Sequence, residues 1–131
     1  MRKVDEKWVE RMKRECAHIK VLPFEEIKAL PEAGEFDGGI YFLWKGDTLQ
    51  YIGKSMHVGE RLTHHDWAFT YAKFRSNKTN PIPYDRHTCL VMCGGRIKEG
   101  DWIKPILRDH ERAYIAHFKP PYNYVARNPG T

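Results

Sequence analysis

The sequence predicts an α+β fold: a small, mainly antiparallel three-stranded β-sheet flanked by helices. Residues 39–45 are rich in β-branched, aromatic and aliphatic side chains, and residues 48–53 alternate between polar and apolar ones, so both segments are typical of strands. Residues 45–47 supply turn chemistry between them, which predicts a hairpin. Residues 88–93 are almost entirely apolar or small and predict a third strand, buried on both faces.

Helices are predicted before, between and after these strands. Residues 4–19 carry a thin apolar stripe at helical spacing, and one or two helical turns should follow over residues 24–30 before a proline ends them. After the hairpin, a helix should run over about residues 57–74. A second long helix should begin at Asp101 or Pro105 and end near Phe118, because proline is tolerated only in the first helical turn.

Residues 1–38 are expected to form an N-terminal helical extension that packs on a domain made of residues 39–131, because the extension has too few apolar residues to fold alone. No apolar run approaches the roughly 20 residues of a membrane span, so no membrane partner is expected. The first residues are charged and lack the apolar core of a signal peptide. Three cysteines, an odd count, argue against a disulfide framework, and a reducing, cytoplasmic compartment fits.

Basic residues are concentrated in two segments of the chain, whose net charge is +5. Residues 1–20 hold seven Lys or Arg against four Asp or Glu, and residues 54–80 hold five against two. Residues 22–37 instead carry five carboxylates and a single lysine. A polyanion such as a nucleic acid would be attracted to the first two segments, although each segment alone is also typical of an ordinary solvated surface.

Four marks in the sequence occur in a specific order and spacing. Gly-Ile-Tyr stands at 39–41 and Tyr-Ile-Gly at 51–53, on the two strands of the predicted hairpin. Arg61, the third mark, follows ten residues after the second tyrosine. The fourth is a closing stretch that runs from Glu111, on the last predicted helix, to a Pro-x-x-Asn that ends at Asn123. In these marks the chain resembles the GIY-YIG nuclease family, and the resemblance covers about residues 39–124.

The resemblance implies a metal-dependent endonuclease that hydrolyses DNA phosphodiester bonds through a single active site. It implies that Glu111 is the ligand of Mg²⁺ or Mn²⁺ and that Arg61 stabilises negative charge on the phosphate in the transition state. Tyr41 is implied to be the general base or the group that orients the attacking water, and Tyr51 to share or support that role. Asn123 is implied to hold the site together rather than to take part in the chemistry.

Residues beside these marks extend the candidate site. Lys54 and His65 could support catalysis, His65 as a second general base. Gly-Lys-Ser at 53–55 is similar to the end of a phosphate-binding P-loop, but the glycine needed five residues earlier is Thr48, so nucleotide binding is rejected. The candidate nucleic-acid contacts are Lys54, Ser55, Arg61, Lys73 and Arg75.

Two other functional classes stay open at this stage: a catalytically silent nucleic-acid-binding module on the same fold, and a structural or regulatory protein. The presence of all five motif residues disfavours both. With a single site in 131 residues, a monomer in solution that can pair on DNA is expected. The family includes homing, restriction, repair and phage or mobile-element enzymes, and the sequence does not choose among these roles.

Overall fold

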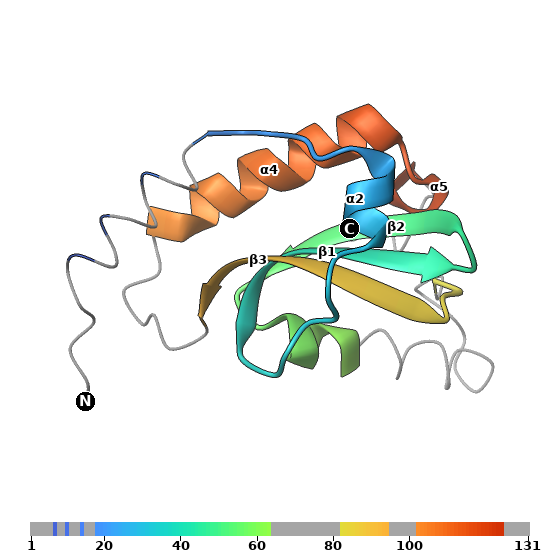
Figure 1. Cartoon of the computed structure of the whole chain (residues 1–131), viewed down its shortest axis with the longest axis horizontal. Coiled ribbons are helices and arrows are strands. Elements are labelled where there is room, and N and C mark those ends of the chain that lie inside the picture. Colours follow the sequence, from blue (N-terminus) through green and yellow to red (C-terminus); the bar gives the residue numbers. More distant parts are fainter. Residues whose placement is uncertain are drawn as a thin grey trace.

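The computed structural model in Figure 1 describes residues 18–63, 82–94 and 102–124, together with Lys7, Glu10 and Arg14. Most of the helix expected over residues 4–19, and the part of the helix expected over residues 57–74 that follows residue 63, lie outside the described residues. So do three candidate site residues: His65, Lys73 and Arg75.

Three antiparallel strands form one sheet in the order β2-β1-β3. They are β1 (Asp37–Lys45), β2 (Thr48–Ser55) and β3 (Arg86–Gly94). Together with the helices that flank the sheet, they confirm the α+β fold class predicted from the sequence. The central strand is β1, and its residues from Gly38 to Trp44 are all buried.

The prediction that the third strand is buried on both faces is wrong. Strand β3 lies at an edge of the sheet, and Val91 is 46% exposed. The strand buried on both faces is β1, which lies between β2 and β3 and packs into an apolar cluster on each face of the sheet. An apolar run alone does not say which strand occupies the centre of a sheet.

Helices cover the sheet on both faces (Figure 1). On one face lie α2 (Phe24–Lys28) and the long helix α4 (Ile103–Phe118), and on the other lies a helical segment over residues 58–63. Pro105 falls in the first turn of α4, as the sequence predicts. Helix α4 ends where Lys119 adopts a left-handed conformation with φ of 49°, and the short helix α5 (Pro121–Tyr124) follows.

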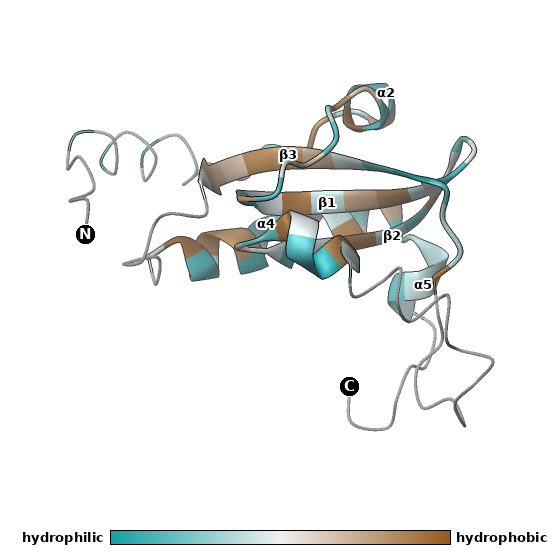
Figure 2. Ribbon diagram, turned by 90° about the horizontal axis from the view of Figure 1, so that it is seen from below, coloured by the Kyte–Doolittle hydropathy of each residue, from teal (hydrophilic) through white to brown (hydrophobic). Residues whose placement is uncertain are grey.

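Two apolar clusters result from the alternation of side chains along β1. Ile40, Phe42 and Trp44 point to the α4 side, where they pack with Ile103, Leu107 and Tyr114. Tyr41 and Leu43 point to the opposite side and pack with Val58 and Leu62 of the 58–63 helical segment. In Figure 2 brown, apolar segments are concentrated on the strands, while teal residues mark the solvent side of α4.

The segment before the hairpin contacts the sheet and α4 through buried or half-buried hydrogen bonds. The Tyr114 hydroxyl donates to the Lys20 carbonyl at 3.2 Å and accepts from the Leu22 N–H at 3.0 Å. Thr88 Oγ1 donates to the Ile27 carbonyl at 2.9 Å and accepts from the Trp44 indole N–H at 3.0 Å.

The division into an extension over residues 1–38 and a domain over residues 39–131 stays a prediction. Within the described ranges, no helix is long and apolar enough to cross a membrane.

Candidate active site

The outer edge of β2 is where the motif residues meet. Among the described strands β2 lies at one edge of the sheet, so none of them pairs with its outward N–H and C=O groups. Asn123, from α5, takes the place of a strand at Ile52. Its Oδ1 accepts a hydrogen bond from the Ile52 N–H at 2.9 Å, and its Nδ2 donates to the Ile52 carbonyl at 2.8 Å. Asn123 therefore fixes this edge by a bidentate amide pair.

Glu111 reaches the same edge two residues farther along, from helix α4. The Lys54 backbone N–H donates a hydrogen bond to its carboxylate. Burial raises the pKa of Glu111 above its ordinary value, while the charges of Lys54, Arg112 and Arg61 and the Lys54 N–H oppose this shift. The half-buried carboxylate is thus held in a positively charged environment at the edge of the sheet.

The two motif tyrosines lie on the other face of the hairpin, beside this edge. Tyr41 is opposite Gly53 in the register of β1 and β2, and its ring crosses the glycine so closely that a Cβ on Gly53 would lie 2.2 Å from Cζ and 2.3 Å from the hydroxyl oxygen. Only glycine leaves room for the phenol there. Tyr51 lies 6.2 Å from Tyr41 between ring centroids.

The tyrosines differ in exposure. Tyr41 is 2% exposed, within the cluster under the 58–63 segment, whereas Tyr51 is half-buried. The family resemblance implies that Tyr41 is the general base or orients the water and that Tyr51 shares or supports this role, but Tyr51 is the more exposed of the two.

At Gly39, the first glycine of the motif, a side chain is excluded by the backbone of the neighbouring strand β3. A Cβ at this position would lie 2.0 Å from the Leu90 carbonyl oxygen of β3. The register between β1 and β3 shifts at this point, between Gly38 and Gly39. The glycine lets the two strands approach one another, so it shapes the sheet that carries Tyr41.

Ser55 is the last residue of β2, and Arg61 lies on the helical segment that comes next. Ser55 Oγ accepts a hydrogen bond from the His57 N–H at 3.0 Å, which fixes the turn between β2 and the helix. Arg61 is exposed on that helix and close enough to Glu111 to lower its pKa.

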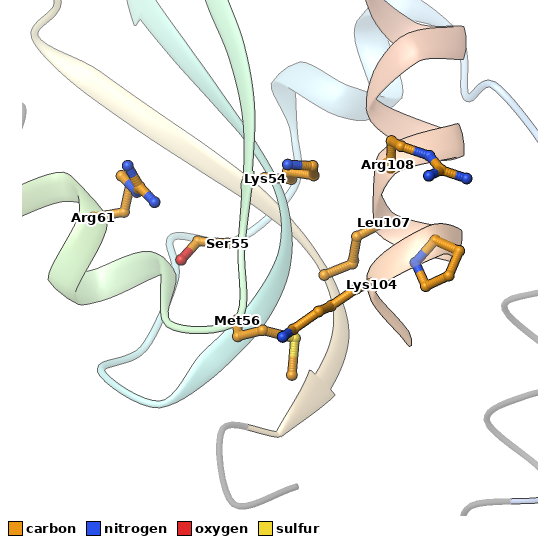
Figure 3. Close-up of a pocket in the computed structure, with 8 residues that line it drawn as sticks. Lys54, Ser55, Met56, Arg61, Lys104, Leu107 and Arg108 are labelled. Atoms are coloured by element: carbon orange, nitrogen blue, oxygen red, sulfur yellow. The ribbon is translucent and has the colours of Figure 1, made fainter. Parts of the chain in front are cut away.

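A cavity of about 640 Å³ opens between the end of β2, Arg61 and helix α4. We call it the cationic groove: its charged residues are Lys54, Arg61, Lys104 and Arg108, and its apolar ones include Met56 and Leu107 (Figure 3). Lys54 projects toward the α4 side of the sheet, as its partner Ile40 does. The groove borders the position of Glu111, which follows Arg108 by one helical turn on α4.

The structure therefore gathers most of the candidate residues at one end of β2. Lys54 and Ser55 are the last two residues of the strand, and Glu111 and Asn123 contact its edge. Sequence reasoning missed Lys104 and Arg108 as parts of the site. Their spacing of seven and three residues before Glu111 places them on the same side of a helix, and this spacing is visible in the sequence.

The donor set for a metal is small. Within the described ranges, no three or more His, Cys, Asp or Glu side chains are grouped so that they could hold a metal ion. Among the described residues, Glu111 is the candidate ligand. A hard cation such as Mg²⁺ fits one carboxylate, because it keeps several waters and takes further oxygen ligands from a substrate phosphate. A zinc-type site would not fit these residues.

Comparison with known proteins finds similarity in solved structures. No family model and no curated protein matches the chain. The GIY-YIG N-terminal endonuclease domain of UvrC from Thermotoga maritima, with magnesium bound, is 19% identical over 76% of this chain and 92% of that chain, with a TM-score of 0.43. A point mutant of that domain, bound to its catalytic divalent cation, is 17% identical over 75% and 90%, with a TM-score of 0.44. The function proposed below is inferred from this chain's own residues.

Proposed function

We propose that the chain is a metal-dependent endonuclease that hydrolyses DNA phosphodiester bonds at the edge of β2. The observation that carries this proposal is the meeting of three groups there. The Glu111 carboxylate is bonded to the Lys54 N–H, Tyr41 lies across the adjacent Gly53, and Arg61 is within electrostatic reach of Glu111. These are the parts that phosphodiester hydrolysis needs: an anchor for a metal, hydroxyls for the attacking water and a cation for the phosphate.

Arg61 and Lys54 would bind the scissile phosphate. Both line the cationic groove, and both lie close enough to Glu111 to lower its pKa. The planar guanidinium of Arg61 can donate two parallel hydrogen bonds to phosphate oxygens, whereas Lys54 adds a point charge. Charge that develops on these oxygens in the transition state would be stabilised by both side chains.

Glu111 would hold Mg²⁺ or Mn²⁺. When bound, the ion would supply Lewis-acid stabilisation of the phosphate oxygens. The chain contributes the position of the carboxylate: the Lys54 N–H fixes one side of it against the β2 edge, and Asn123 fixes the edge itself. A shift of the strand would therefore move the ligand.

The tyrosine hydroxyls would orient the attacking water. Hydrolysis forms a bond from the water oxygen to phosphorus, breaks the bond to the leaving oxygen and releases a proton from the water. Tyr41 and Tyr51, whose ring centroids lie 6.2 Å apart, are the candidate acceptors of that proton. The leaving oxygen takes up a proton in turn, so no other reactant is needed.

A second reading has its own support in the structure. Glu111 and Asn123 both hydrogen-bond to the outer edge of β2, so a nucleic-acid-binding module without catalysis could retain them to fix the position of this edge. The substitution Glu111→Gln separates the two readings. Glutamine keeps an oxygen that can accept from the Lys54 N–H, but it loses the charge that a divalent cation requires.

The test is cleavage of supercoiled plasmid by the purified chain with Mg²⁺ and with EDTA. We expect Mg²⁺-dependent cleavage that Glu111→Gln abolishes and that the exposed control Glu25→Gln on α2 retains. One centre per chain should give nicked circles before linear DNA. Cleavage that is equal in EDTA, or unchanged in Glu111→Gln, would reject the metal-dependent mechanism.

A further inference from the structure

Positive side chains are concentrated in the cationic groove. Four of its eight lining residues are Lys or Arg, and none is Asp or Glu. Like charges that share a groove repel one another, and the cost is recovered when an anion binds between them. Lys54 and Arg61 are accounted for by the proposed nuclease centre, whereas Lys104 and Arg108 of α4 are not.

Lys104 stands where the helix itself disfavours a cation. The first turn of α4 contains no acidic residue, although the N-terminal end of a helix stabilises negative charge by about 0.3–1 kcal/mol. Lys104 occupies that turn instead, and its side chain extends across the groove toward Met56 (Figure 3). Lys104 therefore adds its positive charge to the groove at the end of the helix that favours an anion.

Arg108 follows one turn later. Its Nε donates to the Asp109 carboxylate at 3.3 Å, but both side chains are 50% exposed, and such a pair between neighbours in sequence adds little stability. A guanidinium has five N–H donors, so this one bond does not prevent Arg108 from meeting an anion. Both cations of α4 thus line the groove, where their N–H donors can meet an anion.

We propose that Lys104 and Arg108 bind the phosphate backbone of the DNA strand next to the scissile phosphate, so that the strand runs along α4 away from Glu111. This assignment rests on the proposed nuclease function. A helix rises about 1.5 Å per residue, so Arg108 and Lys104 lie ~4.5 Å and ~10.5 Å from Glu111 along the axis. At about 3.4 Å per nucleotide, that distance corresponds to about three nucleotides.

The apolar residues of the groove are also compatible with a bound DNA strand. Met56, Leu107 and Pro105 line it beside the cations. Deoxyribose and base edges can pack on such side chains while the phosphates face Lys104 and Arg108. Because the contacts are to the backbone, they should hold any sequence about equally well.

The test is the binding of a short fluorescent oligothymidine in EDTA, followed by anisotropy at several salt concentrations. For a single strand, each lost phosphate contact reduces the steepness of log K against log [salt] by about 0.7. If the variant and the wild type bind equally well at 1 M salt, this change is about a fivefold loss of affinity at 0.1 M salt. We therefore expect the double variant Lys104→Gln/Arg108→Gln to bind roughly 25-fold more weakly, with a slope reduced by about 1.4.

The matched control is Lys45→Gln/Lys119→Gln, which removes the same charge from two exposed lysines outside the groove. It should change the affinity less than about threefold. Equal losses in both double variants, or wild-type binding by Lys104→Gln/Arg108→Gln, would overturn the assignment, with thermal melting to confirm that each variant is folded. Because binding is measured without metal, a wild-type chain that binds through the groove but never cuts would overturn the nuclease function alone.

Discussion

Replacing Gly53 by alanine should displace the ring of Tyr41. The new Cβ would lie 2.2 Å from Cζ and 2.7 Å from Cε1 of the tyrosine ring, so the ring must retreat by about 0.8 Å to restore a 3.0 Å contact. Overpacking of this kind costs about 1–3 kcal/mol. For a chain of this size, that corresponds to a fall in melting temperature of roughly 3–12 °C. A displacement near 1 Å of a catalytic group can lower the rate about 100-fold.

Thermal melting and the initial rate of plasmid nicking measure the two effects separately. Gly94→Ala is the matched control, because a Cβ there meets no atom within 4 Å. It should melt and cut like the wild type. If Gly53→Ala also melts and cuts like the wild type, then Tyr41 does not lie across Gly53, and the account of the motif glycine is incorrect. If Gly53→Ala loses stability but keeps its rate, then the position of the Tyr41 hydroxyl has no role in catalysis.

Three further predictions concern Arg61, the two tyrosines and Glu111. Arg61→Lys should lower the turnover at least tenfold, because an ammonium keeps the charge but not the paired hydrogen bonds; near wild-type turnover would assign the phosphate to another cation. Tyr51→Phe should lower the turnover more than Tyr41→Phe, since Tyr51 is the more exposed tyrosine; the reverse order would favour Tyr41 as the base. Glu111→Gln should melt at a higher temperature than the wild type at neutral pH. Burial raises the pKa of Glu111, so its ionisation destabilises the native state above that pKa and not below its ordinary value of 4.5. The difference in melting temperature should therefore close as the pH falls toward 4, and a constant difference would contradict this origin.

The hairpin could be predicted from the sequence because its signals are local. Strand propensity, the turn at residues 45–47 and the two motif tripeptides lie within about 15 residues of one another. The pairing of Tyr41 with Gly53 depends in addition on a register shift between Leu43 and Trp44, which these local signals do not predict. The order of the strands could not be predicted in the same way. The segments of β1 and β3 are both rich in apolar residues, so either could have formed the central strand. In the structure β1 is central and β3 is at an edge, where Val91 is exposed.

The site shows the same division. Its motif residues were recognised from their spacing, but what Asn123 does depends on α5 meeting the open edge of β2, which no local pattern encodes. The cationic groove was missed for a similar reason. Lys104 and Arg108 read as solvated residues of an amphipathic helix until the packing of α4 beside β2 brings them next to Lys54. Tertiary contact, not propensity, defines that surface.

The central claim is that the Glu111 carboxylate, held by the Lys54 N–H at the β2 edge, makes cleavage depend on a divalent cation. The most direct measurement is a time course of supercoiled plasmid with wild type and Glu111→Gln across a Mg²⁺ titration, at matched folded protein. The account predicts nicked DNA that rises with Mg²⁺ for the wild type, and no cleavage by Glu111→Gln at any concentration, although that variant still binds DNA. Cleavage by Glu111→Gln with the same Mg²⁺ dependence as the wild type would contradict it.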